Sequence, residues 1–310
     1  MIRTEYKFLV LHPRVEIPDF RNVIMKNIKL NIPPLPAVIG AIISVQAGAA
    51  IAKGLFPAIG ATGTASLRIG ISALILLAVN RPNLKQLTRT QWKAVIPYGL
   101  CLGAMNVIFY LSLARIPLGL AVTLEFIGPL LLAVLGSRRL VEFLWVLLAA
   151  GGIALIAPWN EQSIDLIGAG LALLAGAFWA GYIVLGRRTS KILDGGQAVA
   201  VGMIFATLIV LPFGIGSGGL SNLTPVMLLS GTALALLSSA IPFSLEMSAM
   251  RQIPAKTFSI LMSLEPAVAA ICGLLFLSEH LSFYEWLAVA MVVMASAGAT
   301  LTKDKEKLNQ

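Results

Sequence analysis

The sequence predicts an all-α integral membrane protein, with ten transmembrane helices arranged as two inverted five-helix repeats and both termini in the cytoplasm. Three observations lead to this prediction: the composition, the spacing of the apolar segments and a duplicated stretch. The 310 residues are 58% hydrophobic and 12% charged, with a mean hydropathy of +0.89. A soluble domain carries about 25% charged residues. This chain therefore has too little polar surface for water, and we expect it to lie in a lipid bilayer.

Ten segments are long and apolar enough to span a membrane, which needs about 20 mostly apolar residues. The connections between them are short and rich in Pro, Gly, Asn and charged residues, as helix breaks require. The predicted spans are 35–53, 61–79, 94–114, 117–135, 142–158, 166–186, 196–215, 226–250, 256–277 and 283–301.

The basic residues orient these spans. Of the 23 Lys and Arg residues, twenty fall in the two tails and in the connections that alternate with them on one side of the membrane. Only Lys53 and Arg115 fall on the opposite side, and Arg68 lies inside a span. Since Lys and Arg gather on the cytoplasmic side, the chain is predicted to have both termini inside. The positive net charge then reflects topology, and we expect no nucleic-acid partner.

Residues 112–145 and 249–286 are two copies of one pattern. Each copy contains Ile-Pro followed by a second proline twelve residues later, at Pro129 and Pro266. The charged residues differ: the first copy has Ser-Arg-Arg at 137–139 where the second has Ser-Glu-His at 278–280. A repeat of five helices must insert the second copy upside down, so the swap of charge is typical of an inverted repeat in a transporter.

This reading divides the chain into four parts. Residues 35–158 form the first repeat and 166–302 the second, with a cytoplasmic tail at 303–310. Residues 1–34 are mixed, basic and interrupted by prolines, and they lack the apolar core of a secretory signal. We expect either a cytosolic tail or a start at Met25, which opens Met-Lys-Asn-Ile-Lys-Leu just before the first span.

Four charged side chains lie within predicted spans and away from their ends: Arg68, Glu125, Glu246 and Glu265. Each costs about 2.5–3.5 kcal/mol at the middle of a membrane helix on insertion scales, so we expect them to have a function. A structural alternative is an Arg68–Glu ion pair that only fixes helix packing. With three carboxylates and one guanidinium, at least one carboxylate lacks a cation, and low dielectric favours its protonated form. This is what a proton-coupled carrier needs.

Prolines lie next to these acids. Glu125 is four residues before Pro129, Glu246 is four after Pro242, and Glu265 directly precedes Pro266. Proline removes a backbone donor and breaks or loosens the helix, and broken helices in membranes line polar cavities. Glu125 and Glu265 belong to the two copies of one helix, so we expect them to face a common cavity at the midplane, from related but unequal depths.

Three uncharged polar residues in the spans are weaker candidates for ligand contact. They are Asn106 and Tyr110, which share one face of the third span, and Gln46 in the first. Hydrogen bonding between helices explains them equally well.

The charges also bear on the substrate. An amino acid is a zwitterion, so its site needs an anion for the ammonium group and a donor for the carboxylate, which a Glu cluster with one Arg provides. A cationic drug would use the carboxylates alone. Aromatic residues make up only 7% of the chain, which is few for a pocket built on stacking or cation–π contacts, so a small polar metabolite is favoured.

The sequence gives no sign of an enzyme or a cofactor site. It lacks His-Glu-x-x-His, Gly-x-Ser-x-Gly and the phosphate-binding Gly-Lys-Ser/Thr. The two cysteines, Cys101 and Cys272, lie in apolar runs without metal-type spacing. We therefore expect no cofactor and no metal, and a third possibility is a membrane partner protein without transport activity.

The chain resembles the drug/metabolite transporter superfamily with two EamA-type domains. Within that superfamily, several of its motifs are similar to those of bacterial inner-membrane exporters of threonine and homoserine. The motifs are Ser66-Leu-Arg68, the 117–129 stretch PLGLAVTLEFIGP, Ser-Arg-Arg at 137–139, Ser244-Leu-Glu246-Met and the 261–267 stretch LMSLEPA. The resemblance runs from about residue 36 to 302.

This resemblance implies a proton-coupled exporter of small amino acids in a bacterial inner membrane, working by alternating access. Glu125 and Glu265 would then carry the proton or bind the ammonium group, Arg68 would pair with an acid or bind the carboxylate, and Glu246 would be a secondary acid. Exporters of other metabolites or of cationic drugs occur in the same superfamily and remain the alternative. The expected partners are protons, a small amino acid and the lipid bilayer.

Overall fold

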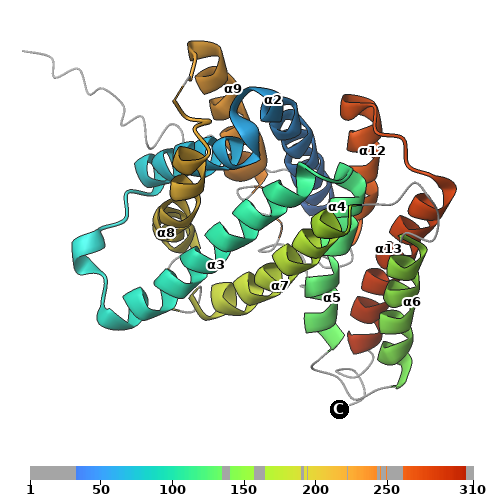
Figure 1. Cartoon of the computed structure of the whole chain (residues 1–310). Coiled ribbons are helices and arrows are strands. Elements are labelled where there is room, and N and C mark those ends of the chain that lie inside the picture. Colours follow the sequence, from blue (N-terminus) through green and yellow to red (C-terminus); the bar gives the residue numbers. More distant parts are fainter. Residues whose placement is uncertain are drawn as a thin grey trace, which may run out of the picture. The chain divides into compact units, whose positions relative to one another are not determined.

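The computed structural model describes residues 33–134, 140–156, 165–189, 192–193, 195–221, 223–242, 245, 249 and 261–304. These residues form helices and turns and contain no strand (Figure 1). Residues 34–310 form one unit, described below, and residues 1–33 a separate one, almost all of it outside the described residues. The all-helical prediction is confirmed for the part of the chain that the structure describes.

The described helices follow the predicted spans closely. Three of the predicted ranges contain a break or a change of helix type: 117–135, 226–250 and 256–277. The elements are α2 (Pro34–Asn80), η1 (Leu84–Gln86), α3 (Arg89–Leu113), α4 (Leu118–Glu125), α5 (Ile127–Val134), α6 (Leu140–Ile156), α7 (Leu166–Thr189), α8 (Gly195–Gly216), α9 (Pro225–Ala235), η2 (Leu236–Ala240), α12 (Glu265–Leu277) and α13 (Phe283–Asp304). Four of the described helices are apolar for at least the length of a membrane crossing: α2, α3, α7 and α8. The number of spans and the orientation of the termini stay predictions.

Helix α2 covers two predicted spans without a loop between them. The chain turns at Gly60, whose φ of 69° and ψ of 168° are not helical. Glycine adopts this conformation readily because it has no Cβ. The hydroxyl of Thr64 donates to the carbonyl of Gly60 at 2.7 Å, which occupies one backbone acceptor at the kink. The sequence predicts a loop between the spans 35–53 and 61–79. In the structure this stretch is helical apart from the kink at Gly60. Lys53 consequently lies within a helix.

The predicted span 117–135 is also divided, into α4 and α5 with a turn at Phe126. Pro129 has no N–H to donate to the carbonyl of Glu125, four residues earlier. The helix therefore breaks one residue after Glu125, three residues before the proline itself. In the second copy, α12 begins at Glu265 after a turn at Ser263-Leu264, with Pro266 in its first turn.

Long-range packing joins the helices of the two predicted repeats. Helix α3 packs along α7 and α8, α2 packs against α8, α9 and α12, and α6 packs along α13 (Figure 1). Helix α4 is buried along its length, between α12 and α7. The segment that carries Glu125 thus lies inside the helical unit, where lipid does not reach it.

Candidate functional site

The Arg68 guanidinium, in the second half of α2, joins three elements. Its Nη1 donates to the hydroxyl of Tyr110 on α3, and its Nη2 donates to the carbonyl of Ser238 on η2, both at 3.1 Å. The guanidinium carbon lies 5.5 Å from the centroid of the fully buried Tyr110 ring, a cation–π distance. Arg68 is itself only partly buried. The structure thus brings together two of the predicted site residues, Arg68 and Tyr110.

The Ser238 carbonyl is available to Arg68 because of a proline. In an α-helix this carbonyl would accept from the N–H four residues later, but residue 242 is Pro242. The segment here is a π-helix, in which the N–H of Ile241 reaches back to the carbonyl of Leu236. The carbonyl of Leu237 is thereby released as well, and it accepts from the Ser44 hydroxyl at 2.7 Å. Pro242 and the π-helix thus leave two backbone carbonyls free to accept hydrogen bonds from side chains of α2.

Glu125 lies at the end of α4 with 8% of its surface exposed. Helix α7 comes so close here that a Cβ added at Gly176 would lie 2.3 Å from the Glu125 carbonyl oxygen. Arg68 is within Coulombic range of the Glu125 carboxylate. Among the described residues, Arg68 forms no ion pair with Glu125 or Glu265. The guanidinium donates to Tyr110 and Ser238, and the Arg68–Glu pair stays a prediction.

Glu265 is 6% exposed and opens α12. Helices α4 and α12 run in opposite directions: Gly119 near the start of α4 lies against Ala270, and the residues after α12 return to Leu118. At 1.5 Å per residue, Glu125 lies about 9 Å along α4 from this contact, and Glu265 about 7.5 Å along α12. The two acids therefore lie at the same end of the pair, at nearly the same level along its axis.

The other predicted residues have separate positions. The side chain of Asn106 donates to the carbonyl of Leu102 at 2.8 Å, a bond within α3 and not the bond between helices that the sequence suggested. Gln46 is 3% exposed, and its Oε1 has no partner in the described part of the chain. It lies seven residues before Lys53 and so on the same face of α2. Glu246 lies outside the described residues.

An ion pair that sequence analysis did not anticipate joins the two halves of the chain. Lys53 Nζ donates to Glu279 Oε1 at 2.5 Å and to the carbonyl of Ile116 at 2.8 Å. Glu279 Oε2 accepts from the N–H of Leu118 at 2.7 Å, which caps the start of α4. Both side chains are largely buried, with 22% and 14% exposed. The predicted topology does contain a sign of this pair. It puts Lys53 and the connection with Glu279 on the same side of the membrane, and the two side chains have opposite charges.

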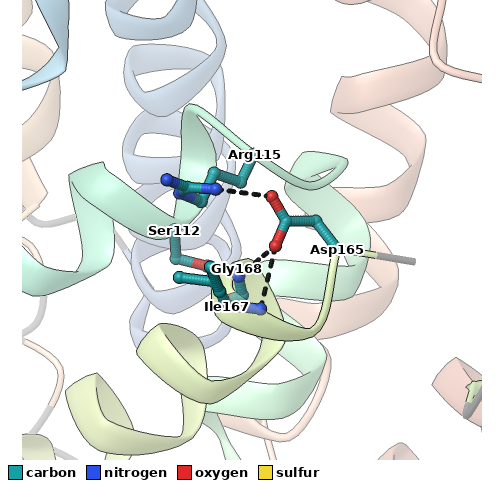
Figure 2. Close-up of polar contacts among 5 residues, drawn as sticks. All are labelled: Ser112, Arg115, Asp165, Ile167 and Gly168. Atoms are coloured by element: carbon teal, nitrogen blue, oxygen red, sulfur yellow. Dashed lines mark hydrogen bonds and ion pairs between the residues drawn. The ribbon is translucent and has the colours of Figure 1, made fainter. Parts of the chain in front are cut away.

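Arg115, the other basic residue predicted on that side, also has an acidic partner (Figure 2). Its Nη1 donates to Asp165 Oδ2 at 2.7 Å, while Asp165 Oδ1 accepts from the N–H groups of Ile167 and Gly168 at the start of α7. The hydrogen bond from Arg115, followed by that from the Gly168 N–H, holds the pKa of Asp165 below its usual 3.8. Ser112 donates to the Gly168 carbonyl at 2.8 Å, so α3 and α7 are joined twice.

The described residues hold no group of three or more His, Cys, Asp and Glu side chains placed to bind a metal ion. The described residues around this region include the Arg68 guanidinium, the buried carboxylates of Glu125 and Glu265, hydroxyls and freed carbonyls. Groups of these kinds can bind and orient a polar solute.

Comparison with known proteins bears on what that solute is. The profile of the EamA-like transporter family matches residues 166–301. The threonine/homoserine exporter RhtA of Salmonella typhimurium (strain SL1344) is 44% identical over 275 residues, which is 88% of this chain and 93% of the exporter. The chain belongs to the EamA-like transporter family.

Further similar proteins extend the comparison. RhtA of Escherichia coli (strain K12) is 43% identical over the same shares of the two chains. The uncharacterized transporter YwfM of Bacillus subtilis (strain 168) is 25% identical over 80% of this chain and 86% of its own length. A crystal structure that is 16% identical superposes with a TM-score of 0.59, covering 86% of this EamA-like chain and 98% of that one, and it bears on the fold alone.

Proposed function

We propose that this EamA-like transporter exports small amino acids, threonine and homoserine among them, across a bacterial inner membrane, and that it is driven by protons. The observation that carries the substrate class is the 44% identity to an exporter of threonine and homoserine along 93% of that exporter's length. The chain is a transporter by family and has no role as an enzyme in this proposal.

The charges around Arg68 support a zwitterionic substrate. A free α-amino acid brings one carboxylate and one ammonium group. Arg68 would take the carboxylate, because a guanidinium donates to a carboxylate in a fixed, directional geometry. Glu125 or Glu265 would take the ammonium group, with Glu246 as a secondary acid. The burial of Glu125 and Glu265 makes such contacts stronger than they would be in water.

The same burial supports proton coupling. Glu125 has no ion pair within the described residues, and in this proposal it gains a proton when it faces one side of the membrane and loses it to substrate or solvent on the other. One charge crossing about 100 mV releases roughly 2.3 kcal/mol. At about 1.4 kcal/mol per tenfold, that supports a gradient of roughly fiftyfold before any pH difference is added.

Alternating access requires that contacts on one face form while those on the other break. In the predicted topology, with both termini inside, Lys53–Glu279 and Arg115–Asp165 lie on the outer face. Lys53 and Glu279 join α2 to α12 and to the start of α4, so opening of that face would separate them. We therefore include Lys53–Glu279 in the proposal as the outer closure.

The decisive experiment measures threonine uptake into inverted membrane vesicles with and without a pH gradient. We expect wild type to accumulate threonine only with the gradient, and Glu125→Gln and Glu265→Gln to lose most of that accumulation. Glu285→Gln is the matched control, because in the described part of the chain the Glu285 carboxylate accepts from the Ser282 N–H at the start of α13, which an amide oxygen can also do. Gradient-driven uptake that is unchanged in both site variants would overturn the proton assignment.

A growth test addresses the substrate separately. Overexpression should protect cells against excess threonine or homoserine and leave their sensitivity to ethidium unchanged. Protection against ethidium alone would favour the export of cationic drugs.

A further inference from the structure

Two neighbouring serines of η2 have buried hydroxyl groups without a hydrogen-bond partner in the described part of the chain. Ser238 is 3% exposed and Ser239 is 0% exposed, and neither Oγ has a hydrogen-bond partner within the described residues. Buried hydroxyls are nearly always hydrogen-bonded in native structures, so each exception calls for an explanation such as an unseen ligand or water.

Other hydroxyls in the described helices have hydrogen-bond partners. Thr64, Thr123, Thr207 and Thr232 each donate to the carbonyl four residues earlier in their own helix, at 2.6–2.8 Å. Ser44, Ser66 and Ser112 donate to carbonyls of other helices, at 2.7–2.9 Å. Ser238 and Ser239 depart from both arrangements in a π-helical segment, a type of local irregularity that is frequent at functional sites.

Ser238 contacts Arg68 through its backbone. Its carbonyl accepts from Arg68 Nη2 at 3.1 Å, and within the described residues the buried Nε of Arg68 has no partner. The Ser238 hydroxyl lies against helix α2, because a Cβ added at Gly48 would lie 2.1 Å from its Oγ. In the described part of the chain, one charged donor and the hydroxyls of two consecutive η2 residues are therefore unpaired.

We propose that Ser238 and Ser239 read the side-chain hydroxyl of the substrate while Arg68 binds its carboxylate. This inference rests on the proposed function and adds what selects among amino acids. A hydroxyl can both donate and accept, so a pair of serines matches a hydroxylated amino acid in either role. In such an amino acid the hydroxyl lies only a few bonds from the carboxylate, which fits two serines adjacent to the Arg68 contact. A site built around a substrate hydroxyl rejects the analogue without it, because the polar groups of the site then stay unpaired.

The test uses 2-aminobutyrate, the amino acid obtained when the hydroxyl group of either threonine or homoserine is replaced by hydrogen. We measure the KM values of homoserine and 2-aminobutyrate in inverted vesicles. Wild type should prefer homoserine by about tenfold or more, the effect of leaving buried hydrogen-bonding groups unpaired. In Ser238→Ala, Ser239→Ala or the double variant, this preference should fall to within about threefold of unity, mainly because the KM of homoserine rises.

A matched control and a conservative variant keep the outcome clear. Ser66→Ala removes a buried hydroxyl that does have a partner, the Val210 carbonyl at 2.9 Å, and should keep the preference. Ser238→Cys conserves the side-chain volume and provides only a weak hydrogen-bonding group, so it tests the idea even if the alanine variants fold poorly. We expect it to lose most of the preference.

Failure of this inference differs from failure of the proposed function. If wild type transports neither amino acid, the proposed function is wrong. If wild type prefers homoserine and both single variants and the double variant keep that preference, the serines do not read the hydroxyl and this inference is overturned.

Discussion

The Arg68 cluster (Arg68, Tyr110, Ser238 and Ser239) and the Arg115–Asp165 pair are built from similar groups and differ in how completely these groups are used. At the end of α3, the two Asp165 oxygens accept from Arg115 Nη1 and from two backbone N–H groups. At the Arg68 cluster, the guanidinium donates to two uncharged oxygens, and its Nε and two serine hydroxyls stay unpaired.

The difference indicates a division of roles. A pair that satisfies its own groups holds helices together and has nothing left to offer a ligand. A buried cluster that leaves polar groups unpaired is costly unless something else binds there. The Lys53–Glu279 pair falls on the structural side of this comparison, since Glu279 uses both of its oxygens.

The largest effect on substrate binding is expected for Arg68→Met. We expect the KM for homoserine to rise by roughly ten- to a hundredfold, because a hydrogen bond to a charged group is worth about 1.5–3 kcal/mol. Arg115→Met is the matched control and should leave that KM within about twofold of wild type. An unchanged KM for Arg68→Met, together with a large fall in Tm, would instead assign Arg68 to helix packing.

An intermediate effect is expected at Lys53–Glu279. Lys53→Met should lower the free energy of unfolding by about 1–2 kcal/mol, more than an exposed pair because both side chains are largely buried. Glu279→Gln should cost less, since an amide oxygen still accepts from the Leu118 N–H. Thermal unfolding of the two single variants and the double variant in detergent gives the coupling between them. Coupling near zero would remove this pair from the contacts that hold the outer face closed.

The smallest effect is expected at Arg115–Asp165, where 43% and 33% of the side chains are exposed. The pKa of Asp165 is lower in the folded protein than its usual 3.8. Its stabilisation is therefore present above that usual value and is lost as the pH falls through the lower folded value. Asp165→Asn keeps an acceptor for the start of α7 and removes only the charge. Its Tm should be slightly below that of wild type at neutral pH and equal to it near pH 2, and a difference that persists at low pH would assign the effect to the cap.

Local sequence was sufficient for much of the fold. Apolar segment length predicted helices over ranges that the described residues largely match, because helix formation in lipid depends on each segment satisfying its own backbone. The prolines also have local effects that the sequence predicts, because each leaves the carbonyl four residues before it without its helical donor. The helix breaks after Glu125, and the Ser238 carbonyl accepts from Arg68. The kink at Gly60 was not predicted, because glycine permits such a conformation without requiring it.

From the sequence come predictions of which groups the chain contains: apolar spans, a duplicated helix, Lys53 and Arg115 on the side with few basic residues, and acids within the spans. Which of these groups lie in contact depends on the tertiary structure. Arg68 reaches a carbonyl 170 residues away, and Lys53 reaches an acid 226 residues away. Pairings over such separations depend on how helices pack, and packing is set by close contacts such as that of Gly119 with Ala270. Within the described residues the hydroxyls of Ser238 and Ser239 are unpaired, which no periodicity or motif in the sequence revealed.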